Sequence, residues 1–287
     1  MFMNKKPTVA IMYDFDKTLC NNDMQNYSFI PSLGISTDDF WGEVNEFAKT
    51  NQMDGLLCYM YMMIKKANSR DIPIRRENFV KLGEKMEYFP GVEEWFDRIN
   101  KYGEEKGVEV QHYVISSGLQ EIIEGSAIYK NFKKTFACEF LYDINGVAVW
   151  PKNVVNFTTK TQFLFRINKG ELDISEDRRL NTYTPMEERP IPFRNMIYIG
   201  DGMTDVPCMK LVKVNGGQSI AVFRRRNKMT AAKLLSEDRV NFITEANYTE
   251  NRELDTIVKT IIDKMAVVDR LCELNTKHKK SIEKQGE

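Results

Sequence analysis

The sequence predicts an α/β fold, in which a doubly wound parallel sheet carries an inserted α-helical cap. Three apolar runs of strand length are spread along the chain, at residues 9–13, 108–115 and 195–199. They are apolar almost throughout, which is typical of parallel strands that helices cover on both faces. Helical periodicity between the runs completes the alternation of strand and helix from which doubly wound sheets are built.

Length and composition limit the classes of protein that the chain can belong to. Its 287 residues are enough for one large domain with an insert. Lys and Arg number 41, as do Asp and Glu, so no global positive field attracts nucleic acid and the balance favours a small-molecule or protein partner. Five cysteines without a close pair argue against a disulfide framework or a zinc site.

The expected compartment is the cytoplasm, without contact to a membrane. The N-terminus lacks the features of a signal peptide, and no apolar run approaches the roughly 18 residues that span a bilayer. Only two histidines are present, His112 and His278, so any catalysis must depend mainly on carboxylates, hydroxyls and lysines.

The first strand is followed by a long segment without a convincing strand. Residues 21–86 carry helical periods, and about 65 residues are too many for a simple loop between a strand and its crossover helix. We therefore predict that residues 21–86 form a helical cap domain inserted into a sheet domain made of residues 1–20 and 87–287. The sequence leaves the oligomeric state open.

The rest of the chain continues the alternation of helix and strand. The final polar residues, 275–287, are expected to be frayed. The other expected elements are a helix over 92–99, a strand over 108–115, a β-hairpin over 135–151, a helix that begins at Lys160, a surface excursion over 169–192, strands over 195–199 and 219–223, and a helix over 254–265.

Two aspartates stand where the first strand should end. Asp14 and Asp16 belong to the stretch "DFDKT", and side chains two positions apart on an extended chain share one face. This spacing directs both carboxylates toward the carboxyl edge of the sheet, where open α/β sheets bind ligands. Taken alone, the pattern also fits an ordinary aspartate turn.

A second acidic group follows the strand at 195–199. The stretch "YIGDGMTDVP" places Asp201 and Asp205 four residues apart, and its glycines permit tight turning. Two acidic strand ends within one sheet repel each other unless a cation lies between them. Carboxylate oxygens at this density suit Mg²⁺, which binds one or two carboxylates together with water and phosphate oxygens.

Hydroxyls and a lysine complete the set of candidate residues. Ser116 and Ser117 end the strand at 108–115, where hydroxyl groups can hold a phosphate oxygen. Lys160, in "NFTTKTQFLF", supplies a compact positive charge that suits a phosphate. Each feature is common by itself, but their order along the chain is acid pair, hydroxyl, lysine and acid pair.

This ordered set resembles the four motifs of the haloacid dehalogenase superfamily. "DFDKT" matches the first motif, Ser116 the second, Lys160 the third, and Gly200 to Asp205 the fourth. The resemblance covers about residues 8–227 and implies a Rossmann-like core. Asp16 argues for phosphate-ester chemistry, because the dehalogenase branch lacks an acid at that position.

The resemblance also implies a role for each matched residue. Asp14 would be the nucleophile that forms an aspartyl phosphate, and Asp16 would be the general acid and base. Asp14, Asp201, Asp205 and the main-chain carbonyl of Asp16 would hold Mg²⁺. The groups expected to bind the phosphoryl oxygens are Thr18, Ser116, Ser117 and Lys160.

Within the superfamily, the chain resembles phosphoserine phosphatases, which have a helical cap at the first insertion position. "DFDKTLCNND" resembles their "DFDSTLVNNE", and Asp23 would bind a substrate amino group on the cap side. The helix "LLCYMYMMIKKANSR" has no arginine before Arg70, which favours a larger or more apolar leaving group. A 5'-nucleotidase and a phosphotransferase or phosphomutase remain alternatives. The sequence argues against a third alternative, a non-catalytic binding protein on this fold, because no motif residue is lost.

Overall fold

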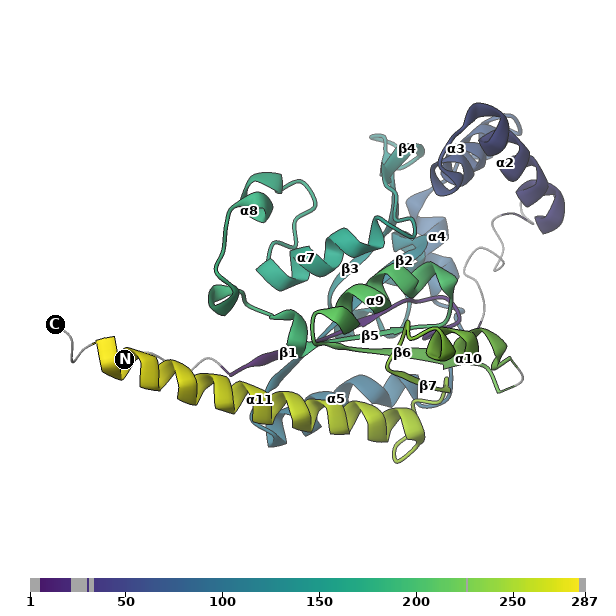
Figure 1. Cartoon of the computed structure of the whole chain (residues 1–287). Coiled ribbons are helices and arrows are strands. Elements are labelled where there is room, and N and C mark those ends of the chain that lie inside the picture. Colours follow the sequence, from purple (N-terminus) through teal and green to yellow (C-terminus); the bar gives the residue numbers. More distant parts are fainter. Residues whose placement is uncertain (1–5, 22–29, 31–33, 226, 284–287) are drawn as a thin grey trace.

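The computed structural model describes residues 6–21, 30, 34–225 and 227–283, and its centre is a seven-stranded sheet (Figure 1). The strand order is β4-β3-β2-β1-β5-β6-β7. Every pair is parallel except β3 with β4, so the predicted α/β class is confirmed. The strands are β1 (Thr8–Tyr13), β2 (Glu109–Leu119), β3 (Phe132–Tyr142), β4 (Ala148–Asn153), β5 (Met196–Gly200), β6 (Gln218–Phe223) and β7 (Phe242–Glu245).

Helices cover both faces of the sheet. α5 (Val92–Glu105) and α11 (Glu253–Glu283) lie along one face, whereas α7 (Lys160–Lys169) and α9 (Val206–Val214) lie on the other (Figure 1). Smaller helices are α6 (Gln120–Gly125), α8 (Asp177–Asn181) and α10 (Met229–Ser236). Because β1 stands between β2 and β5, the carboxyl ends of these neighbouring strands meet at one edge of the sheet.

A buried chain of hydrogen bonds joins β1 to α5 and β2. The Trp95 Nε1–H donates to the Tyr13 hydroxyl (2.8 Å), which donates to His112 Nδ1 (3.0 Å). His112 Nε2 then donates to the Asn100 side-chain oxygen (3.0 Å). Burial lowers the pKa of His112 to about 3, so this histidine is a neutral structural residue.

Between β1 and α5, three labelled helices lie in the described part of the chain. They are α2 (Thr37–Asn51), α3 (Gly55–Asn68) and α4 (Arg76–Gly83), and α2 and α3 stand away from the sheet (Figure 1). Their small core is aromatic, with the rings of Trp41 and Tyr59 stacked 5.0 Å apart. The expected helical insertion is confirmed, whereas the exact domain boundaries at residues 21 and 86 stay a prediction.

Helix α4 packs directly on the sheet domain through glycines. A Cβ on Gly83 would lie 2.0 Å from the Ile122 carbonyl oxygen of α6, and one on Gly125 would lie 1.8 Å from the Val80 carbonyl oxygen of α4. Side chains at these positions would push the two backbones apart. The absence of a Cβ on both residues therefore sets the distance between α4 and α6.

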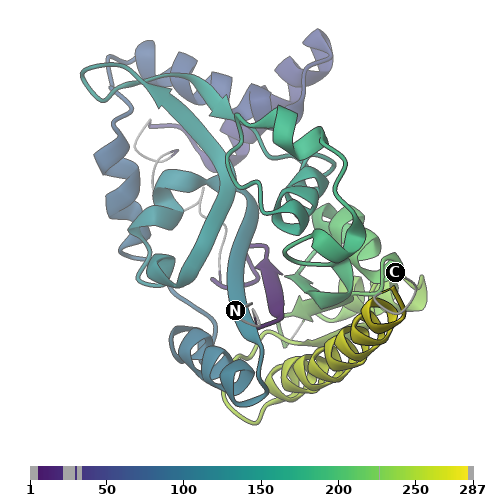
Figure 2. The ribbon, with the colours of Figure 1, turned by 90° about the vertical axis from the view of Figure 1, so that its left-hand side faces the viewer.

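The predicted β-hairpin is confirmed, and its first strand is also part of the main sheet. β3 pairs with β2 on one side and with β4 on the other. Figure 2 shows β3 curving from the sheet toward the insert. The Ala148 N–H donates to the Ile74 carbonyl (2.8 Å), and the Asn156 side chain donates to Asp54 (2.8 Å). These bonds tie the hairpin and the loop after it to the insert.

The sequence prediction was wrong at the C-terminal tail and incomplete at one edge of the sheet. Residues 275–283, expected to be frayed, continue α11, which is helical from Glu253 to Glu283. The short strand β7 was not predicted, because its four residues carry too little periodicity. Within the described ranges, no helix has both the length and the apolar character needed to cross a membrane.

Candidate active site

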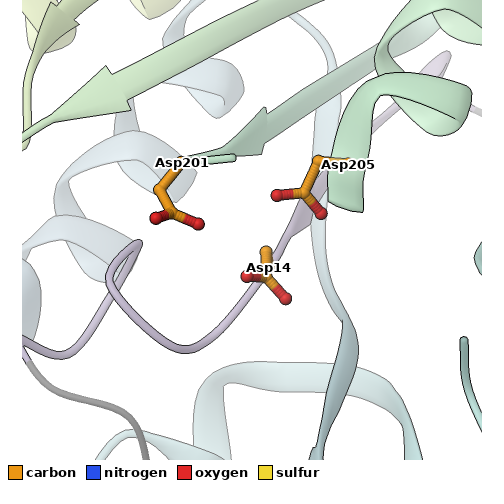
Figure 3. Close-up of side chains that lie close together, drawn as sticks. All are labelled: Asp14, Asp201 and Asp205. Carbon is orange, nitrogen blue, oxygen red and sulfur yellow. The ribbon is translucent and has the colours of Figure 1, made fainter. Parts of the chain in front are cut away.

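Three carboxylates converge at the carboxyl edge of the sheet (Figure 3). Asp14 follows β1, Asp201 follows β5, and Asp205 lies one turn further on. One oxygen from each lies within 4.8 Å of the others. Asp14 lies close to Asp201 and Asp205 because β1 pairs with β5. The pairing extends one residue beyond Tyr13, where the Asp14 N–H donates to the Ile199 carbonyl (2.9 Å).

A glycine and a tyrosine fix the position of Asp205. A Cβ on Gly200 would lie 2.6 Å from Asp205 Oδ2, so glycine is needed for the carboxylate to lie against the strand end. The Tyr198 hydroxyl donates to Asp205 Oδ1 (2.8 Å), and the Gly202 N–H donates to Oδ2 (3.4 Å). Asp205 is therefore held on both oxygens and is fully buried.

Lys160 joins the two strand ends. Its Nζ donates to Asp14 Oδ1 (2.8 Å) and to Asp205 Oδ1 (2.7 Å), and its side chain is 1% exposed. The residue begins α7, as predicted, because Asn156 organises the turn before the helix. The Asn156 side-chain oxygen accepts from the N–H groups of Thr158 (3.1 Å) and Thr159 (2.9 Å).

The carboxylates carry more negative charge than this ammonium neutralises. Burial, followed by repulsion from Asp205, raises the pKa of Asp14 to about 6, although Lys160 opposes the rise. Burial and the charges of Asp14 and Asp205 raise the pKa of Asp201 to about 8. Burial alone would lower the pKa of Lys160, but the attraction of its two carboxylates outweighs burial and the net shift is upward.

This donor set fits a hard divalent cation. Three converging carboxylates are ligands of the type that Mg²⁺ prefers, and the excess negative charge makes ionisation of all three costly without a further cation. The residues that could hold the ion are Asp14, Asp201 and Asp205.

Two buried hydroxyls near these strand ends have no protein partner in the described chain. They are Thr18 Oγ1, in the turn after β1, and Ser117 Oγ, near the end of β2. A buried hydroxyl without a hydrogen bond is costly, so both are available to an oxygen-rich ligand. The third predicted hydroxyl, that of Ser116, accepts from the Gly118 N–H (3.0 Å).

Asp16 lies beside the carboxylate cluster rather than within it. Lys17 adopts a left-handed conformation (φ 56°), so the chain turns directly after Asp16. The half-buried carboxylate of Asp16 accepts a hydrogen bond from the Cys20 thiol (3.7 Å). This placement separates Asp16 from the three-carboxylate group. Asp23, expected on the cap side, lies outside the described residues.

Two tyrosines at the site were not predicted. Tyr198 lies three residues before Asp201, inside an apolar run that gives no reason to single it out. The Tyr248 hydroxyl donates to the Thr18 carbonyl (3.0 Å) from 230 residues away, so only the fold brings them together. Both phenols anchor groups that line the site and contribute no charge to it, because burial raises their pKa values further.

The fold and the site together define an α/β enzyme with an acidic centre at the carboxyl ends of parallel strands. Residues 11–210 match the family model of haloacid dehalogenase-like hydrolases, and the chain belongs to this family. An uncharacterized protein of Borreliella burgdorferi is 30% identical over 282 residues, which cover 88% of this chain and 96% of the relative.

Solved structures show the same fold at low sequence identity. A probable phosphoserine phosphatase from Vibrio cholerae has a TM-score of 0.58 and 14% identity, covering 93% of this chain and 67% of that chain. A substrate-bound phosphoserine phosphatase complex has a TM-score of 0.56 and 17% identity, covering 89% of this chain and 99% of that chain. The predicted family and the similarity in fold to phosphoserine phosphatases are confirmed.

Proposed function

We propose that the protein is a Mg²⁺-dependent phosphomonoester hydrolase that acts on a small phosphorylated metabolite through an aspartyl-phosphate intermediate. The observation that carries the proposal is the convergence of Asp14, Asp201 and Asp205 around the buried Lys160. Support also comes from the shared fold of a phosphoserine phosphatase described as a phospho-aspartyl intermediate analogue, with a TM-score of 0.55 and 18% identity.

The ion would be held by Asp14, Asp201, Asp205 and the main-chain carbonyl of Asp16. When bound, Mg²⁺ supplies positive charge to the phosphoryl oxygens and to the crowded carboxylates. The excess negative charge described above supports this assignment. The unpartnered hydroxyls of Thr18 and Ser117, with Ser116 beside them, would donate hydrogen bonds to the phosphoryl oxygens.

In the first step, a carboxylate oxygen of Asp14 attacks phosphorus and the bond from phosphorus to the leaving oxygen breaks. Asp16 gives its proton to that oxygen, so the product leaves as a neutral alcohol. Lys160 holds the orientation of Asp14 through its 2.8 Å hydrogen bond and keeps a positive charge beside the reacting group.

In the second step, Asp16 takes a proton from water, and the oxygen of that water attacks phosphorus. The bond between phosphorus and Asp14 then breaks, which releases inorganic phosphate and restores both aspartates. The position of Asp16 outside the metal cluster supports this division of roles, because an acid and base must exchange its proton freely.

Asp14→Asn tests the proposal. The substitution keeps the shape of the side chain but removes the nucleophile, so hydrolysis of p-nitrophenyl phosphate with Mg²⁺ should fall at least ~10³-fold. Asp97→Asn, on the exposed face of α5, is the matched control and should keep full activity. Undiminished turnover by Asp14→Asn would contradict the proposed nucleophile.

Product analysis separates the alternatives within the same chemistry. A hydrolase releases inorganic phosphate whatever alcohol is present, whereas a phosphotransferase or phosphomutase forms a new ester that depends on the acceptor. A panel of nucleoside monophosphates tests the 5'-nucleotidase alternative. The balanced charge of the chain supports a small-molecule partner, and the buried free thiols of four cysteines support a cytoplasmic location.

A further inference from the structure

A cavity lined by two arginines, neither of which has an ion-pair partner among the described residues, lies at the same edge of the sheet as the three carboxylates. Its volume is about 500 Å³, and Arg224 and Arg225, which directly follow β6, contribute its positive charge. The other walls come from the segment that precedes α5, from the loop after β7 and from Asn21.

The pairing of β5 with β6 places this cavity next to the acidic site. Gly200 is level with Ala221, so Asp201 is level with Val222, and Arg224 lies two residues further along. Arg224 therefore follows the strand that neighbours β5, at the edge of the sheet where Asp201 follows β5.

Hydrogen bonds join the walls of the cavity to the loop that carries Asp14 and Asp16. The Asn21 N–H donates to the Glu87 carbonyl (3.1 Å), and the Phe89 N–H donates to the Leu19 carbonyl (3.0 Å). On the opposite wall, Asn247 precedes Tyr248, whose hydroxyl donates to the Thr18 carbonyl. The loop that carries Asp14 and Asp16 is therefore hydrogen-bonded to the segment before α5 and to the segment after β7, which both line the cavity.

The two guanidinium groups are available to a ligand. Both side chains are exposed, and in the described part of the chain neither forms an ion pair, whereas other arginines such as Arg98 and Arg194 are paired with carboxylates. Arg224 lies 6.0 Å from the ring centroid of Phe89, which positions it without using its N–H donors. Glu245 also lines the cavity, and one carboxylate leaves a net positive charge beside the two arginines.

We infer that the cavity at Arg224 and Arg225 binds a second anionic group on the leaving group of the phosphate ester. The inference rests on the proposed function, because it assumes a phosphoryl group bound at Asp14. Guanidinium groups form paired hydrogen bonds to the oxygens of a carboxylate or a phosphate, so either group suits the cavity. The protein therefore prefers anionic phosphomonoesters to those with a neutral leaving group.

The test compares hydrolysis of four esters at saturating Mg²⁺. Two of them carry a second anionic group: 3-phosphoglycerate has a carboxylate and fructose 1,6-bisphosphate has a second phosphate. The other two, glycerol 3-phosphate and p-nitrophenyl phosphate, have a neutral leaving group. Arg224→Ala and Arg225→Ala should each lower kcat/KM at least ~10-fold for the carboxylate or the bisphosphate ester, mainly through KM. The other two esters should change less than ~2-fold.

Further variants test whether charge is the cause. Arg224→Lys should recover part of the loss, and Glu245→Gln should raise kcat/KM for the anionic esters because it removes the opposing charge. Arg270→Ala, at an exposed position on α11, is the matched control and should change nothing. The ester that responds identifies whether the cavity takes a carboxylate or a phosphate.

Two results would overturn the inference. One is an equal loss on all four esters, or no loss on any, in the arginine variants. The other is a wild-type protein that hydrolyses p-nitrophenyl phosphate but neither hydrolyses the two anionic esters nor is competitively inhibited by them. If the wild-type protein hydrolyses none of the four esters, that result counts against the proposed function instead. The inference is then tested by calorimetry, which compares the binding of the anionic esters to wild type and to Arg224→Ala.

Discussion

Replacing Lys160 by methionine removes the ammonium that joins Asp14 to Asp205. Methionine keeps much of the volume of the lysine side chain, so the change is mainly one of charge. The side chain of Lys160 is 1% exposed, and those of its partners Asp14 and Asp205 are 9% and 0% exposed. Water cannot replace it, and three carboxylates are left facing one another.

The expected loss of stability is about 3–5 kcal/mol, the range found when one partner of a buried ion pair is removed. For a chain of this size, 1 kcal/mol corresponds to about 2–4 °C in Tm, so Lys160→Met should melt at least ~6 °C below wild type without Mg²⁺. Added Mg²⁺ should raise the Tm of the variant more than that of wild type, because it supplies the missing positive charge. Activity should fall ~10²–10³-fold, since a charge beside the reacting group is lost.

The assay is thermal unfolding followed by circular dichroism, with EDTA and with Mg²⁺. Lys152→Met is the matched control, because Lys152 forms an ion pair of the same length with Glu139 (2.7 Å) but is 47% exposed. An exposed pair contributes at most ~1 kcal/mol, so the control should melt within ~4 °C of wild type. If Lys160→Met melts as close to wild type as the control does, the inferred role of the buried bridge is wrong.

Three more predictions follow from particular contacts. Burial lowers the pKa of His112 to about 3, so below about pH 6.5 the unfolded chain binds a proton at this residue and the folded chain does not. The stability that depends on neutral His112 is therefore complete above about pH 6.5 and declines as the pH falls toward 3. Urea unfolding at pH 7.5 and at pH 5 measures this contribution as a difference between proteins: over that range wild type should lose roughly 2 kcal/mol relative to His112→Asn and nothing relative to His278→Asn, at an exposed position. The comparison between proteins is needed because the raised pKa values of Asp14 and Asp201 favour the folded state as the pH falls, and they do so in all three proteins. Gly125→Ala should destabilise the protein by about 1–3 kcal/mol in the same assay, because its Cβ would meet a backbone carbonyl of α4 at 1.8 Å; an unchanged midpoint would show that α4 and α6 separate easily. Tyr198→Phe removes the 2.8 Å hydrogen bond to Asp205 and should weaken Mg²⁺ binding by about 3–10-fold in calorimetric titrations. Equal affinity would show that Lys160 and the Gly202 N–H are sufficient to orient Asp205.

Much of the fold could be predicted because its signals are local. The strands that became β1, β5 and β6 are short continuous apolar runs, and the alternating residues on each side of the Asp143–Gly146 turn predict the hairpin of β3 and β4. Local patterns do not report pairing, so they gave no indication that β3 also joins the main sheet. The four residues of β7 are too few for a pattern of either kind.

The sequence by itself determined the family and the chemical types of the candidate residues, because strand ends with acids, hydroxyls and a lysine follow one another in a recognisable order. Only the tertiary structure decided which of these residues are hydrogen-bonded to one another. Lys160 donates to Asp14 and to Asp205, which lie 146 and 45 residues away in the sequence. It also decided that Asp16 stands beside the carboxylate group and that Arg224 follows a strand next to the one that carries Asp201. These contacts and positions depend on the order and register of the strands. The packing of the whole core selects that order and register, and no short segment of the sequence encodes them.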